Sequence, residues 1–174
     1  MLSALQQVSG LYRRAQLWRC VWVGDGVKVR GRVVVHGPGR VSVGHRVFFD
    51  GRELPIELFA GPGAELHIGD GCVLEPGVSL EAHRRVVVGA RCHLGRLAKV
   101  MDNHFHAVSG DRLTSVEAVP VTLAEEVTLG ERSIVLPGAL LERGVTLLEG
   151  TVVSRRVRAG TTLMGSPARA VEKG

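Results

Sequence analysis

Aliphatic side chains recur at every sixth position through the C-terminal third of the chain. They are Leu123, Leu129, Val135, Leu141, Leu147 and Val153. Four positions after each stands a small or β-branched residue: Val127, Ser133, Ala139, Val145, Thr151 and Val157. Six is a multiple of the two-residue strand period and not of the helical period, so extended backbone keeps each set on one face. The pattern predicts short strands joined by tight turns and wound into a coiled parallel sheet with the aliphatic residues inside.

The same six-residue template recurs upstream in separate blocks. They comprise Ile68, Leu74 and Leu80; Val88, Leu94 and Val100; and, more weakly, Val23, Val29 and Val35. Slips of about two residues separate some blocks, and we expect the extra residues to lie at turns, where they leave the faces unchanged. Three hexads would close one triangular coil. Residues 23–164 are therefore predicted to form a single all-β solenoid.

Three segments interrupt the repeat. Residues 1–22 have apolar positions at three-residue spacing and predict an N-terminal helix that caps the open end of the solenoid; a helix lying on a membrane surface, with its arginines on the polar side, is the alternative. Residues 51–64, with two prolines, are predicted to be an irregular loop. The polar segment 101–120 separates two well-phased blocks. A long loop on a regular scaffold is where function tends to lie.

Composition narrows the function classes. Glycine supplies 23 of 174 residues and aromatics only 4%, as turns and a narrow interior require. The net charge of +5 comes almost entirely from scattered arginines, without a polybasic tract, so nucleic-acid binding is not predicted. The chain has no apolar run long enough to span a membrane and no signal-peptide pattern at its start. Three cysteines without a CxxC pair favour a reduced, cytoplasmic setting.

Candidate chemistry concentrates at the start of the polar segment. Asp102, Asn103, His104, Phe105 and His106 follow one another there. Histidine is the usual general base near neutral pH, and on extended backbone the two histidines would face the same side. The acid and the amide are predicted to orient the base or the loop, or simply to form a turn.

The hexads together with this loop resemble the left-handed β-helix hexapeptide acyltransferases. Residues 68–106 are similar to the sub-group that acetylates sugars and surface polysaccharides, and residues 120–173 to the C-terminal coils and tail of the same family. The left-handed winding comes from the resemblance alone, because crossover connections are ordinarily right-handed. The resemblance also implies a short C-terminal helix or tail at residues 165–174.

The resemblance implies a homotrimer with sites between subunits, acetyl-coenzyme A as cosubstrate and no required metal. An active-site histidine would take the proton from an acceptor hydroxyl, which attacks the thioester directly. The alignment favours His106 as this base, with His104 as the alternative.

Other site residues are likewise implied by the resemblance. His83 would line the acceptor site, with Glu75 near the same edge. Small residues of the C-terminal coils would contact coenzyme A: Gly130, Ser133, Pro137, Gly138 and Gly150. Basic and tail residues would meet its phosphates or close the site: Arg155, Arg156, Pro167, Arg169 and Lys173.

Departures from the family pattern leave alternatives open. Thr128 stands where many relatives carry tryptophan, so the acceptor is expected to be unusual. Gly77 and Ala82 replace polar residues of the galactoside and maltose enzymes. The expected activity is O-acetylation of a sugar or polysaccharide hydroxyl; the alternatives are N-acetylation of an amino sugar and a non-catalytic scaffold. The histidine spacing does not match a γ-type carbonic anhydrase.

Overall fold

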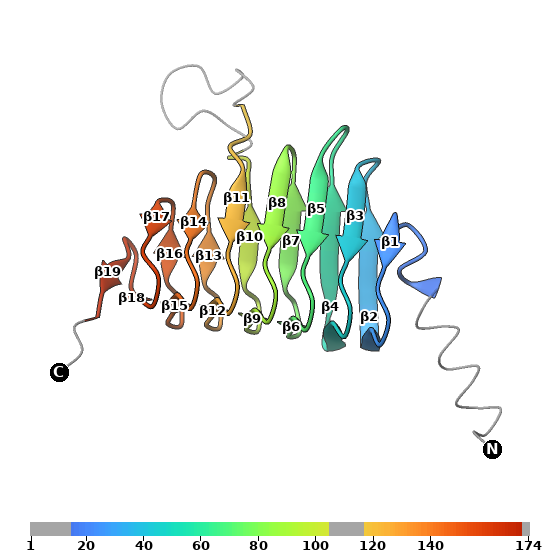
Figure 1. The fold of residues 1–174 in the computed structure, drawn as a ribbon, viewed down its shortest axis with the longest axis horizontal. Helices are drawn as coiled ribbons and strands as arrows, with labels where there is room; N and C mark the ends of the chain where they lie inside the picture. The colour runs from blue at the N-terminus through green and yellow to red at the C-terminus, as the bar shows by residue number, and fades with distance from the viewer. Residues whose placement is uncertain (1–14, 105–116, 172–174) are drawn as a thin grey trace.

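The strands of the structure wind into a three-sided solenoid (Figure 1). A computed structural model describes residues 15–104 and 117–171. The first face is a seven-stranded parallel sheet: β1 (Trp22–Val23), β3 (Arg40–Val43), β5 (Glu65–Ile68), β8 (Arg85–Val88), β11 (Val121–Leu123), β14 (Leu140–Leu141) and β17 (Arg156–Val157).

The second and third faces follow in turn along each coil. The second face holds β6 (Val73–Leu74), β9 (His93–Leu94), β12 (Thr128–Leu129), β15 (Thr146–Leu147) and β18 (Thr162–Met164). The third face holds β7 (Ser79–Ala82), β10 (Lys99–Met101), β13 (Ile134–Val135) and β16 (Val152–Val153). Two long strands, β2 (Lys28–His36) and β4 (Phe48–Ala60), run from the second face into the third and join them as one continuous sheet.

The six-residue pattern predicted the interior correctly. Every aliphatic residue of the C-terminal series is buried, as are all the small residues that follow four positions later. Leu129 pairs with Leu147 and Val135 with Val153, so one coil there takes 18 residues. Upstream, Leu74 pairs with Leu94, a coil of 20 residues. The two added residues lie at the corner between the third and first faces, as the phase slips predicted.

The expected irregular loop at residues 51–64 is wrong over most of its length. Strand β4 continues through residue 60, with Ile56, Leu58 and Ala60 buried inside and Glu57 and Phe59 facing outward. Extra residues at the corner between the second and third faces shift the six-residue phase while the strand alternation persists.

The ends of the solenoid are covered without a regular helix in the described residues. Residues 1–14 of the expected N-terminal helix lie outside that part. Leu17 is buried, and the Gln16 side chain accepts a hydrogen bond from Val33 N at 2.7 Å and donates one to Gly31 O at 3.2 Å. The first coil is thus capped where β2 is bulged.

The expected C-terminal helix is wrong for residues 165–171. The chain turns at residues 165–168, and β19 (Arg169–Ala170) then pairs antiparallel with β18. The turn begins at Gly165, whose φ of 91° suits a reversal and not a helix. A returning strand satisfies the edge that the last coil would otherwise expose.

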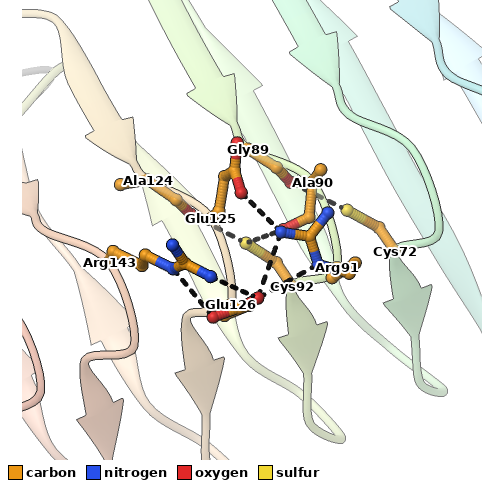
Figure 2. A network of polar contacts seen from close by, with 9 residues as sticks. All are labelled: Cys72, Gly89, Ala90, Arg91, Cys92, Ala124, Glu125, Glu126 and Arg143. Carbon is orange, nitrogen blue, oxygen red and sulfur yellow. Dashed lines mark hydrogen bonds and ion pairs between the residues drawn. The ribbon is translucent and has the colours of Figure 1, made fainter.

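An ionic network ties together the coils before and after the 102–120 segment (Figure 2). Arg91 bonds both Glu125 and Glu126, and Arg143 from the following coil bonds Glu126 at 2.9 Å. Hydrogen bonds from Arg143 and Arg91 lower the pKa of Glu126 to about 2. Because Glu126 ionises more readily in the folded chain than in the unfolded one, its contribution is complete above its ordinary pKa and is lost as the pH falls towards 2.

We expect Glu126→Gln to lower the melting temperature at neutral pH and to flatten its decline between about pH 5 and pH 2. Added salt should shrink the difference from wild type, because the pair is exposed. Calorimetric melting across this pH range provides the measurement. Glu57→Gln is the matched control, since Glu57 forms no ion pair among the described residues. An equal acid slope in wild type and Glu126→Gln would contradict the assignment.

Candidate functional site

Asp102 lies where the chain leaves the solenoid, just before the residues that the structure does not describe. Its side chain is fully buried, and its carboxylate accepts three backbone hydrogen bonds, from His83 N at 2.7 Å, Arg84 N at 2.7 Å and Arg85 N at 2.6 Å. The carbonyl of Asp102 also accepts a hydrogen bond from Val119 N at 2.8 Å. One residue therefore fixes the chain where it leaves the solenoid and where it returns.

The three backbone hydrogen bonds bear on the expectation that Asp102 orients the base or the loop, or forms a turn. A buried acid whose oxygens are bonded to backbone N–H groups is held by them and faces no ligand. These contacts join Asp102 to the turn at His83–Arg85 and to the returning chain at Val119, as expected of a residue that holds the two ends of the loop.

The candidate bases lie just beyond this anchor. His104 is exposed, two residues after Asp102, and Asn103 is half-buried between them. Phe105 and His106 lie outside the described residues. The structure therefore places the start of the predicted catalytic motif on the edge between the third and first faces, at the level of β10 and β11.

His83 lies on the same edge, at the turn whose N–H groups bind Asp102. Its Nε2 is 3.0 Å from Glu81 Oε1, and its ring packs against Phe59 with centroids 5.3 Å apart. On the other side, Phe59 packs against His36 at 5.0 Å. His83 is thus one of three rings in a row along this edge.

The structure separates Glu75 from His83, contrary to expectation. Glu75 follows β6 at the corner between the second and third faces, one corner away from the turn after β7. There its carboxylate accepts a hydrogen bond from Arg96 N at 2.9 Å and lies 2.9 Å from His93 Nε2. In one chain these two residues cannot line the same acceptor site.

The expected cofactor residues of the C-terminal coils also lie at two different corners of the solenoid. Pro137 and Gly138 lie on the edge of Asp102, and Gly138 N donates to Val119 O at 3.1 Å. Gly130 and Gly150 lie at the corner of Glu75. A Cβ at Gly130 would approach Glu149 N to 2.7 Å, so close stacking of the coils already explains that glycine.

Ser133 is wrong as a cofactor contact through its side chain. The side chain is fully buried inside the solenoid, and its hydroxyl has no hydrogen-bond partner among the described residues. It occupies an inward-facing small position of the hexad, where Ala98 and Thr151 stand in the coils before and after it.

Three of the four described tail candidates gather around Ala168. Arg155 follows β16 at the corner of Asp102, whereas Arg169 lies on β19, beside β18 of the second face. Arg155 and Arg169 each donate to Ala168 O at 3.4 Å, and Pro167 is exposed beside them. Arg156 instead projects from the first face, where its Nε donates to Glu142 at 2.8 Å. Lys173 lies outside the described residues.

Sequence reasoning missed Phe59 and His36 as members of this edge. A signal was present: Gly-Pro-Gly occurs at residues 37–39 and again at 61–63, and the two turns stand at the same corner in successive coils. Thr128, in place of the family's tryptophan, is half-buried on the second face and pairs with His93.

The described residues contain neither a cluster of metal-binding side chains nor a membrane-spanning helix. They contain no group of three or more side chains suited to hold a metal ion. They also contain no helix long and apolar enough to cross a membrane.

We expect Asp102→Ala to lower the free energy of unfolding by about 3 kcal/mol or more, because it leaves three buried N–H groups without an acceptor. Denaturant unfolding measures this. Asp70→Ala is the matched control: its carboxylate accepts one backbone hydrogen bond, from His45 N at 2.8 Å, and is exposed, so its loss should cost about 1 kcal/mol. Equal losses in the two variants would show that the three bonds carry no special weight.

Ser133→Ala should leave stability unchanged or raise it by about 1 kcal/mol, since it removes a buried hydroxyl without a partner. It should also leave the binding of acetyl-coenzyme A unchanged. The two measurements are denaturant unfolding and calorimetric titration. A weakened titration with unaltered stability would return Ser133 to the ligand site.

In sequence, the chain resembles curated proteins over a short segment. No family model matches the chain. Over 56 residues it is 30% identical to 2,3,4,5-tetrahydropyridine-2,6-dicarboxylate N-acetyltransferase of Staphylococcus aureus, a match that spans 32% of this chain and 23% of that enzyme.

Solved structures cover much more of the chain. A hexapeptide-repeat-containing acetyltransferase from Vibrio cholerae, also solved in complex with acetyl-coenzyme A, has a TM-score of 0.62 at 13% identity over 99% of this chain and 81% of its own. A polysialic acid O-acetyltransferase has a TM-score of 0.58 at 15% identity over 87% of both chains. An N-acyltransferase from Bacillus cereus, solved with dTDP-4-amino-4,6-dideoxyglucose and coenzyme A, has a TM-score of 0.59 at 17% identity over 98% of this chain and 89% of its own. The chain is a parallel β-solenoid with the fold of the hexapeptide-repeat acetyltransferases.

Proposed function

We propose that this protein is an acetyl-coenzyme A-dependent O-acetyltransferase that acts on a hydroxyl of a sugar or polysaccharide unit. The observation that carries the proposal is the order of residues along one edge of the solenoid. His83 and its neighbouring rings lie on the N-terminal side of Asp102 and His104, and Pro137, Gly138 and Arg155 lie on the C-terminal side.

In the proposed reaction, a histidine of the projecting segment accepts the proton of the acceptor hydroxyl. The hydroxyl oxygen bonds to the thioester carbonyl carbon, the carbon–sulfur bond breaks, and the histidine returns its proton to the leaving thiolate. A positioned base supplies roughly 10²–10⁴ in rate. His106 is the proposed base and His104 the alternative. Asp102 sets the start and the return of the segment that carries both.

The C-terminal part of the edge suits a long polyanionic cosubstrate. Gly138 has no side chain and is exposed, so a narrow chain can lie against the backbone there. Arg155 lies at the end of the same edge, and Arg169 donates to the same carbonyl as Arg155; both are exposed guanidinium groups able to bind phosphate. The proposal includes left-handed winding, a homotrimer and a cytoplasmic setting, in keeping with the resemblance to this family.

N-acetylation of an amino sugar is the second candidate. The Staphylococcus aureus and Bacillus cereus relatives are N-acyltransferases, and the latter was solved with an amino-sugar nucleotide. The same histidine can take a proton from an amine as from a hydroxyl. Paired acceptors that differ only in a hydroxyl or amino group separate the two activities.

We expect His106→Ala to lower kcat by about 10²–10⁴ while the affinity for acetyl-coenzyme A stays unchanged, because a base need not hold the cosubstrate. Thiol release over a panel of sugar acceptors and calorimetric titration of acetyl-coenzyme A measure the two quantities. His104→Ala should have the smaller effect. His67→Ala is the control; His67 lies on the first face, bonded to Ser42 at 2.9 Å.

Two outcomes would contradict this proposal in different ways. Near wild-type turnover in His106→Ala, with loss in His104→Ala, would move the base to His104. Absence of acetyl-coenzyme A binding at millimolar concentration in wild type would overturn the acetyltransferase and favour a non-catalytic scaffold.

A further inference from the structure

Three rings form a row along the Asp102 edge, one from each of three successive coils. His36 ends β2, Phe59 stands near the end of β4, and His83 follows β7. Their centroids are separated by 5.0 Å and 5.3 Å, and their planes are tilted by 55° and 45°. His36 is exposed, and Phe59 and His83 are half-buried, so solvent reaches each ring. The row continues outward from the base of the projecting segment, because the backbone N–H of His83 is bonded to Asp102.

A carboxylate stands beside the ring nearest to Asp102. Glu81 Oε1 is 3.0 Å from His83 Nε2, and the two side chains are 27% and 26% exposed. The imidazole is thus held between an acid and the ring of Phe59, and its orientation is defined before any ligand arrives. A carboxylate has lone pairs left for further donors after one hydrogen bond. Glu81 can therefore accept hydrogen bonds from ligand hydroxyl groups.

Glycine turns keep the row uncovered. A Cβ at Gly37 would lie 3.0 Å from Phe59 Cε2 and 2.1 Å from Ala60 O, so no side chain is tolerated there. Gly61 lies between two rings: a Cβ would be 3.6 Å from Phe59 Cε1 and 3.6 Å from His83 Nδ1, an ordinary contact distance. At Gly61 a side chain would fit, but it would lie over the rings. Within the described part of the chain, Gly37 and Gly61 therefore place no side chain over the rings.

We propose that this row is an extended binding site for a saccharide chain, with one subsite on each of three coils. Aromatic rings offer apolar contact to the C–H faces of pyranoses, and a few placed polar groups fix the hydroxyls. The spacing of the rings is close to the length of one pyranose residue in a chain. The inference deepens the proposed function on which it rests: the acceptor is an oligosaccharide or polysaccharide, and not a free monosaccharide.

Charge favours a hydroxyl-rich chain over a nucleic acid. A nucleic acid would require basic groups along its backbone, whereas Glu81 lies within the row and Glu57 is exposed on the same face. Arg19 donates to Gly37 O at 3.1 Å at the outer end of the row.

The test compares chain lengths. Maltose-series, chitin-series and sialic acid saccharides, each as the monosaccharide, disaccharide and hexasaccharide, are titrated calorimetrically into wild type with saturating coenzyme A. In at least one series the hexasaccharide should bind about tenfold or more tightly than the monosaccharide, equivalent to about 1.4 kcal/mol. Equal affinities in every series, or no binding of any saccharide at millimolar concentration, would overturn the inference.

Variants test whether the rings cause the higher affinity for longer saccharides. Phe59→Ala should abolish the gain with length, and Gly61→Val should do so by covering the row. His36→Ala should weaken the hexasaccharide and leave the disaccharide unchanged. Phe48→Ala is the matched control, a half-buried outward-facing aromatic of the second face that contacts Arg30. An unaltered gain in both Phe59→Ala and Gly61→Val would overturn the inference.

The same proteins distinguish this result from the proposed reaction. Acetyl-coenzyme A binding reports on folding in every variant and does not involve the row. Acetyl transfer without any dependence on chain length would uphold the proposed function and refute the ring row as a site. A length-dependent affinity without acetyl transfer would do the reverse.

Discussion

The in-register stacking of parallel coils is the constraint on which the rest of the structure depends. Each inward aliphatic residue rests on its equivalent in the coils before and after it, as Leu94 does between Leu74 and Leu129. Stacking aligns equivalent corner positions in a column, in which successive coils are roughly 4.8 Å apart. A corner position in one coil therefore lies beside its equivalent in the next, whatever their separation in sequence. A site on such a scaffold is a column, and its members come from several coils.

An insertion can be accommodated in this scaffold only if the coils on either side of it still stack. Leu94 and Leu129 are direct partners although residues 102–120 lie between them in the chain. Two devices preserve the register. Asp102 fixes the departing chain to the turn of the preceding coil and to Val119 of the returning one. At another corner, Arg91 and Glu126 bond across the same junction (Figure 2). A residue at the start of the insertion can thus be fully buried and still hold both ends of the insertion.

The sequence predicted the features that repeat and missed those that occur once. The hexads identified the interior, the three faces and the two-residue slips, because each depends on a period preserved over many coils. The β-strand through residues 51–60 was missed because extra residues at a corner shifted the six-residue phase. The alternation of buried Ile56, Leu58 and Ala60 with outward-facing residues remained. The returning strand β19 pairs with the otherwise unpaired edge of the last coil. No local sequence pattern predicts such a strand. The burial of the Ser133 side chain was not foreseen, because a small polar residue suits a ligand groove and a crowded interior equally well.

The separation of Glu75 from His83 shows where sequence proximity misleads in a solenoid. The two residues stand eight positions apart, and a strand between them carries the chain from one corner to the next. His36, Phe59 and His83 are more than twenty positions apart and make contact. Distance along the chain thus predicts neighbours poorly, whereas equivalence of corner position predicts them well. That reasoning places the rings, the Asp102 anchor and the Gly138 turn in one column, with the rings on the N-terminal coils and Gly138 on the C-terminal ones. The described ends of the inserted segment, at Asp102 and Val119, lie in this column between the two groups.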